Sequence, residues 1–189
     1  AVRAAMAAWI MALSRDTQVI LFFFAFCSTF MNAQFSITSQ GFKNNNGGDY
    51  AVYEFPGKQK AELFQAASTS ILKSMTGTLP SYYSNNEDFI VLTNKVRKLV
   101  YKGICGLTAE YILRFAIDDG KITVYAPKVD LSGIANGAEI LLFLDAGKNW
   151  NGRHFHIFDK EGNLKEDEIK MKLENYFNEE IENLMQLNF

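Results

Sequence analysis

The spacing of apolar residues changes along the chain, and each spacing predicts a different element. From Tyr50 the sequence YAVYEF alternates between apolar and polar residues, as a strand does, and ends at Pro56-Gly57, which predicts a turn. Across residues 58–75 the apolar residues recur every three or four positions, which predicts a helix with one apolar face. These positions are Leu63, Phe64, Ala67, Ile71 and Met75.

Strand patterns dominate the middle of the chain. Residues 76–87 are interpreted as a loop, and short strands are predicted over 88–93, 98–105, 109–117 and 121–125. The last two strands are joined by Asp118-Asp119-Gly120, a strong hairpin turn because glycine tolerates positive φ. Residues 128–152 stay open between strand and helix, since periodicity cannot decide so short an apolar run as 140–144.

The end of the chain predicts a strand, a turn and a long helix. Residues 154–158 form the strand and residues 159–163 the turn, after which Asn163 can cap a helix with Glu166 three positions later, as in a capping box. The helix carries an apolar stripe that needs a surface to cover. Its members are Ile169, Leu173, Tyr176, Phe177, Ile181 and Leu184.

This order of elements predicts an α+β fold with a curved antiparallel sheet and both helices packed on one face. Residues 50–189 are expected to form one domain, preceded by a polar linker over 34–49. Cys105 is the single cysteine after residue 33 and, between Ile104 and Gly106, is interpreted as a small buried hydrophobe.

Residues 1–33 are interpreted as an export segment. The uncharged run VILFFFAFCSTF over 19–30 is shorter than the roughly 20 apolar residues that cross a bilayer. A signal-peptide core with cleavage after Ala33 is therefore expected, with an uncleaved anchor as the alternative. Phe26 precedes Cys27 where a lipoprotein needs a small residue, which disfavours lipidation. The mature protein is expected in the periplasm, on the outer-membrane surface or outside the cell, without a membrane span.

The charge balance excludes one class of partner. The formal net charge is −2, whereas nucleic-acid binders usually carry a strongly basic face. Positive charge gathers around Lys95, Arg97, Lys98 and Lys102, and the last helix is acidic. This separation is interpreted as two solvated faces, with guidance of a protein partner as the alternative.

Several strings in a fixed order resemble an exported Bacteroidetes family called domain of unknown function 4468. The strings are YAVYEFPGK, DDGKITVYAPKV, IFDKEGNLK and ENYFNEEIENLM, and Glu62-Leu63-Phe64 is similar to the family's acidic-Leu-aromatic pattern. The resemblance covers about residues 50–187. It implies a fold like that of the TATA-binding protein (TBP) and an envelope or secreted location, and it implies no activity.

His154 and His156 are the candidate metal ligands. Residues two apart on a strand face the same side, so both imidazoles could meet one ion, with Asp145 or Asp159 as a third ligand. The alternative is an ordinary solvated strand face. Residues 159–163 lack the glycine position and the final glutamate of a calcium loop, so they are interpreted as a turn.

Tyr82, Tyr83 and Trp150 are the candidate binding residues, because exposed aromatic residues in loops often anchor a protein or stack on a sugar. The alternative is that the tyrosine pair beside Pro80 covers the core. The chain has no nucleophile elbow and no phosphate-binding glycine loop, so an enzyme is not expected and no cofactor is predicted.

These features together predict a non-catalytic exported binding or adaptor module that contacts another envelope protein. The alternatives are a glycan-binding accessory protein that uses the loop aromatics and a metal-dependent one that uses His154 and His156.

Overall fold

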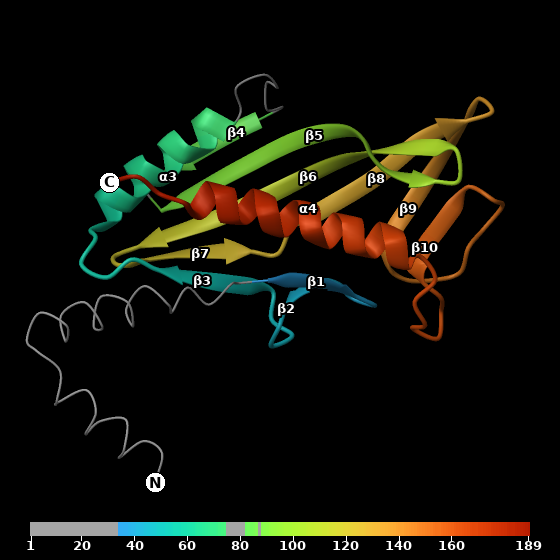
Figure 1. Cartoon of the computed structure of the whole chain (residues 1–189), viewed down its shortest axis with the longest axis horizontal. Coiled ribbons are helices and arrows are strands. Elements are labelled where there is room, and N and C mark those ends of the chain that lie inside the picture. The colour runs from blue at the N-terminus through green and yellow to red at the C-terminus, as the bar shows by residue number, and fades with distance from the viewer. Residues whose placement is uncertain (1–33, 75–81, 87) are drawn as a thin grey trace, which may run out of the picture. The chain divides into compact units, whose positions relative to one another are not determined.

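The computed structural model describes residues 34–74, 82–86 and 88–189, with the side chains of 82–86 left out (Figure 1). More of these residues are in strands than in helices. One helix follows the third strand, and the other follows the last strand. The elements are β1 (Phe35–Thr38), β2 (Gly41–Asn44), β3 (Tyr50–Glu54), α3 (Lys60–Ser74), β4 (Tyr82–Asn86), β5 (Phe89–Lys102), β6 (Cys105–Asp118), β7 (Lys121–Tyr125), β8 (Lys128–Ala135), β9 (Ala138–Ala146), β10 (His154–Phe158) and α4 (Asp167–Met185).

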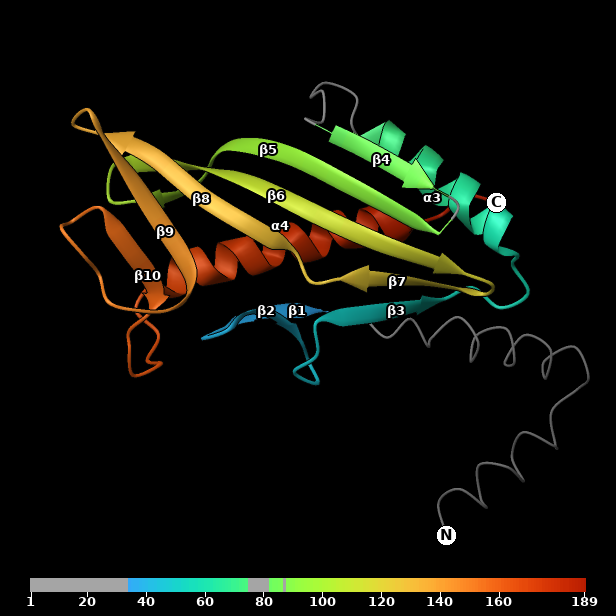
Figure 2. The ribbon, with the colours of Figure 1, turned by 180° about the vertical axis from the view of Figure 1, so that it is seen from behind.

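The large sheet forks at β6. The main path runs β10-β9-β8-β6-β5-β4, while β7 also pairs with β6 and β3 pairs with β7. Along one edge of β6, Thr108 pairs with Ser132 of β8, and further on Phe115 pairs with Val124 of β7. Two groups of strands therefore leave the same edge of β6 and diverge, as Figure 2 shows. The strand pairings of this sheet are antiparallel except that of β10 with β9.

Both helices cover one face of this sheet, and the opposite face is open among the described elements (Figures 1 and 2). Most members of the predicted apolar stripes lie in the core, where α3 contributes Leu63, Ala67 and Ile71 at zero exposure. Phe64 and Tyr176 are only partly buried against it, and Met75 lies outside the described residues. The strand β6 alternates between buried and more exposed residues, as expected for a sheet with one covered face. The predicted α+β class and the curved antiparallel sheet with helices on one face are confirmed. The buried residues of β6 are Cys105, Leu107, Ala109, Tyr111, Leu113, Phe115 and Ile117.

The interpretation of residues 34–49 as a polar linker is wrong, because β1 and β2 form an antiparallel pair there. Phe35, Ile37 and Phe42 are buried in the core. Side chains of α4 satisfy the outer edge of β1: the Phe35 amide donates to Asn178 Oδ1 at 2.8 Å, and the Ile37 amide donates to Glu174 Oε1 at 2.6 Å. Two four-residue strands are too short for a periodic signal, and their partners are 137 to 143 residues away in sequence.

The strands predicted over 88–93 and 98–105 are mostly one long strand, β5, but residues 103 and 104 form the turn to the next strand and Cys105 begins β6. An irregularity between Val96 and Val100, with Lys98 at φ 54°, interrupts its pairing with β6 and broke the alternation in the sequence. The region left open, 128–152, contains the β8–β9 hairpin. The interpretation of 76–87 as a loop is wrong over Tyr82–Asn86, which pairs with β5 as an edge strand.

The start of α4 also differs from the prediction. Asn163 donates its side-chain amide to Asp159, and the helix begins after Glu166, whose side chain makes no capping hydrogen bond. Glu166 instead forms an ion pair with Lys102 of β5. A contact between distant elements therefore replaces the local capping box, which sequence spacing alone cannot reveal.

A polar cluster lies between α4 and the sheet. The Tyr111 hydroxyl accepts a hydrogen bond from Asn94 Nδ2 at 3.1 Å and lies 3.4 Å from the Tyr176 hydroxyl. Burial raises the pKa of both tyrosines, and burial also raises the pKa of the Glu180 carboxyl beside them. The cluster thus holds a carboxyl group whose charged form is disfavoured by desolvation.

Glu180→Gln is expected to be more stable than the wild type at pH 7. In the folded protein the pKa of Glu180 lies above the ordinary value of 4.5, so the folded state binds this proton more tightly than the unfolded state does. Wild-type stability therefore falls as the pH rises from about 4.5 through the folded pKa. The advantage of the variant should shrink as pH falls towards 4. Urea unfolding at several pH values measures it, and Glu179→Gln on the exposed face of α4 is the control. A difference independent of pH would contradict the assignment.

Candidate functional site

Three of the residues proposed from the sequence meet at the β9–β10 end of the sheet. His154 and His156 lie on β10, and Trp150 precedes that strand. Phe143 of β9 joins them, because His156 pairs with it in register. We call Phe143, Trp150, His154 and His156 the ring row. Neighbouring ring centroids are 5.7 Å apart for Trp150 and His154, 6.0 Å for His154 and Phe143, and 4.9 Å for Phe143 and His156.

His156 is held on several sides. Its ring stacks on Phe143 at an interplanar angle of 24°. A Cβ added at Gly147 would lie 2.2–2.4 Å from three atoms of the same ring, so the imidazole packs directly against this glycine. Nδ1 lies 3.2 Å from Asp145 Oδ1, and the His156 amide donates to Asn149 Oδ1 at 3.0 Å. These contacts fix the orientation of the imidazole.

Trp150 is displayed by a tight turn. Its amide donates to the His154 carbonyl at 3.0 Å and its carbonyl accepts from the His154 amide at 3.1 Å. Three residues lie between them, of which Asn151 and Gly152 have φ of 51° and 62°, the left-handed pair of a type I′ turn, and the Arg153 amide donates to the Trp150 carbonyl at 3.1 Å. The indole is 63% exposed although the backbone below it is fixed.

A groove of about 620 Å³ lies at the fork of the sheet, between β2 and the β8–β9 hairpin. We call it the fork groove. Phe143 and Asp145 belong to its lining, so it is continuous with the ring row. Its charged residues are Asp49, Arg114, Lys128, Asp130 and Asp145.

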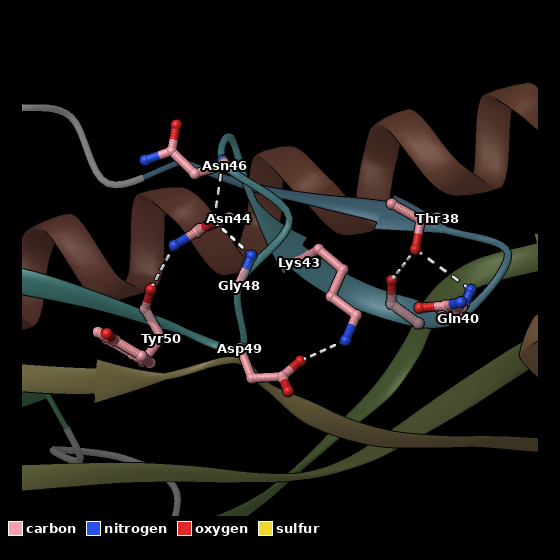
Figure 3. A network of polar contacts seen from close by, with 9 residues as sticks. Thr38, Gln40, Lys43, Asn44, Asn46, Gly48, Asp49 and Tyr50 are labelled. Carbon is pink, nitrogen blue, oxygen red and sulfur yellow. Dashed lines mark hydrogen bonds and ion pairs between the residues drawn. The ribbon is translucent and has the colours of Figure 1, made fainter.

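The loop from β2 to β3 contributes Asp49 to the lining of this groove. Hydrogen bonds of Asn44 hold the loop in place (Figure 3). Asn44 Oδ1 accepts from the amides of Asn46 at 2.9 Å and Gly48 at 2.7 Å, while Nδ2 donates to the Tyr50 carbonyl at 2.6 Å. Lys43 pairs with Asp49 at 2.5 Å. The segment that the sequence suggested was a linker is therefore an ordered part of the site.

The described residues contain no group of three His, Cys, Asp or Glu side chains placed to hold a metal ion. Asp145 is near His156, whereas Asp159, the other proposed ligand, is engaged in its own turn. Ion pairing with Lys165 and hydrogen bonds from Asn163 lower the Asp159 pKa to about 2. The metal site thus stays a prediction that rests on one contact between a histidine and a carboxylate.

Tyr82 and Tyr83 do not join Trp150. They lie on β4, opposite Thr93 and Leu92 of β5, whereas β9 and β10 are at the other end of the strand order. Their side chains lie outside the described residues. The three aromatic residues therefore belong to two separate regions of the sheet.

A second aromatic surface, which the sequence did not reveal, lies on the open face of the sheet. Tyr50 pairs across strands with Tyr125, and the Arg114 guanidinium lies 5.1 Å from the centre of the Tyr125 ring. Phe89 stacks on Tyr125 at 6.4 Å. We call these four residues the aromatic–arginine patch. Outward-facing aromatics in an alternating strand were the available signal, but the strand pairing that gathers them was unknown.

Comparison with solved structures identifies the fold. The chain matches no family model, and no curated protein matches it. A solved TBP-like protein from Parabacteroides distasonis has a similar structure, with a TM-score of 0.50 and 16% identity over 74% of this chain and 92% of that one. A solved protein of the domain of unknown function 4468 family from Bacteroides ovatus gives a TM-score of 0.46 and 10% identity over 70% of this chain and 79% of that one. The TBP-like fold expected from the sequence is confirmed.

Proposed function

We propose that this chain is a non-catalytic, exported binding module that engages another envelope protein through the open face of its sheet. The observation that carries the proposal is the aromatic–arginine patch. Tyr50 is 51% exposed and Phe89 is 41% exposed on a face that no described helix covers.

The composition of the patch suits a protein interface. Tyrosine, phenylalanine and arginine are enriched where protein–protein interfaces concentrate binding energy. Arg114 over Tyr125 and Phe89 against Tyr125 hold these side chains in place, which lowers the entropy lost when a partner binds. A partner that covers this face would bury aromatic rings that are now exposed to solvent.

The absence of catalytic motifs in the sequence supports a binding role. Cys105, the one thiol in the described residues, is buried with its side chain in the core. The His156–Asp145 contact favours the alternative of a metal-dependent accessory protein, and zinc titration of the wild type and of a His154→Ala, His156→Ala double variant tests it. Zinc bound by the wild type and lost in the double variant would support that alternative.

The export segment predicted over 1–33 supports an envelope location. No helix in the described part of the chain combines the length and the apolar content needed to cross a membrane. An envelope partner would meet the module in the compartment to which the signal directs it.

Cross-linking of the tagged full chain in the envelope, followed by mass spectrometry, is expected to recover one recurrent protein. Truncation of central interface residues typically costs about 2 kcal/mol or more, roughly a thirtyfold loss of affinity. Tyr125→Ala combined with Arg114→Ala should therefore remove that protein from the recovered material.

Leu72→Ala is the matched control, because Leu72 is 55% exposed on α3, which covers the other face. It should leave recovery unchanged. No recurrent protein with the wild type, or undiminished recovery with the double variant, would contradict the proposal.

A further inference from the structure

We propose that the ring row and the adjoining fork groove bind a carbohydrate chain. The ring row is made of other rings than the aromatic–arginine patch and lies on the other branch of the sheet, whereas the fork groove shares Arg114 with that patch. The proposal does not depend on the protein partner.

Two rings of the ring row are exposed to solvent. Trp150 is 63% exposed and Phe143 is 38% exposed, although contact with an apolar surface would remove both from water. One face of a pyranose ring carries C–H groups and stacks on an aromatic face. The Phe143 and His156 faces stack on each other and His156 also packs against Gly147, so Trp150 and the exposed part of Phe143 are the places for such contacts.

Polar groups at the edge of the row match sugar hydroxyls, which both donate and accept. Asp145 uses Oδ1 for His156, and its side chain is 61% exposed, so Oδ2 is available to accept from a hydroxyl. The His156 side chain is only 17% exposed and directs Nδ1 at Asp145, so it orients the carboxylate that faces solvent. A purely apolar ligand would leave this carboxylate without a partner and lose affinity.

The fork groove extends the site with mixed charges. Its volume of about 620 Å³ lies within the range of about 300–1,000 Å³ that ligand pockets occupy. Its three carboxylates, on Asp49, Asp130 and Asp145, accompany the cations Arg114 and Lys128. Carboxylates repel a phosphate backbone, whereas both kinds of charged group bond to hydroxyls, so the lining favours a sugar chain over a nucleic acid.

Contacts within the protein hold Trp150 and His156 in place. The tight turn fixes the backbone of Trp150, and Gly147, Phe143 and Asp145 fix His156. Ordering side chains on binding costs roughly 0.5–1.5 kcal/mol each, and preorganised rings avoid much of that loss. A shallow surface can therefore hold a sugar chain with few contacts.

Affinity electrophoresis of the full chain tests the proposal, with β-glucan, xylan, mannan, polygalacturonate and chondroitin sulfate as probes. At least one polysaccharide is expected to retard the wild type, and chelation by EDTA should leave the retardation unchanged. Trp150→Ala and Phe143→Ala should each weaken binding about tenfold or more without lowering the melting temperature by more than the control does.

Phe189→Ala is the control, because Phe189 is 59% exposed and contacts Phe55 and Lys58 instead of the ring row. It should bind as the wild type does. No retardation by any of these polysaccharides, retardation that survives both ring variants, or retardation abolished by EDTA would overturn the proposal.

Discussion

Replacing Phe35 and Ile37 together by alanine is expected to leave too little stability for the folded state. Both side chains are at most 2% exposed. Buried phenylalanine and isoleucine truncations cost about 3–5 and 2–5 kcal/mol, and the sum is comparable with the whole stability of a domain, about 5–15 kcal/mol. Urea unfolding followed by circular dichroism should show the transition shifted to low denaturant or lost.

Ser36→Ala provides the matched control, since Ser36 lies between the two and is only partly buried. Its unfolding transition should move by no more than about 0.5 kcal/mol. If residues 34–49 were a linker, the double variant and the control would unfold alike.

Phe177→Ala on α4 is expected to lower the free energy of unfolding by about 3–5 kcal/mol, a large loss for a single substitution. Phe177 is fully buried, and its ring meets Phe42 at 5.4 Å, Tyr111 at 5.1 Å and Tyr176 at 5.1 Å. Truncation removes the ring that joins β2, β6 and α4 and leaves a cavity among them. Chemical denaturation measures the loss.

Glu179→Ala is the control for this change, because Glu179 lies two residues after Phe177 on the exposed side of the same helix. It should alter stability by no more than about 0.5 kcal/mol. A Phe177→Ala loss below about 1 kcal/mol would mean that the aromatic cluster is not a centre of the core.

The two predictions concern one structural arrangement. Phe42 of β2 packs edge-on against Phe177, and Glu174 and Asn178 of α4 bond to the backbone of β1. The last helix thus holds the first strands in place, and those strands supply a wall of the fork groove through Phe42. Core stability and the shape of the proposed glycan site should therefore change together.

The candidate site shows how far residue types alone lead. His154 and His156 lie on β10, where the sequence predicts a strand, and the exposed Trp150 lies beside His154. Phe143 was missed because its strand lay in the region left open, and its position beside His156 depends on the pairing of β9 with β10. Tyr82 and Tyr83 were grouped with Trp150 on loop assignment alone, although β4 is at the other end of the strand order.

Local periodicity determined the two helices, the hairpin at Asp119-Gly120 and the α+β class, because each depends on residues within a few positions of one another. Tertiary structure alone decided the recruitment of β1 and β2 and the fork at β6. It also decided the ring row. These features depend on pairings between distant segments, such as Phe35 with Asn178, whose sequence separation leaves no periodic trace. Local sequence thus determines the helices and strands, whereas the surfaces proposed to bind partners form only where those elements pack together.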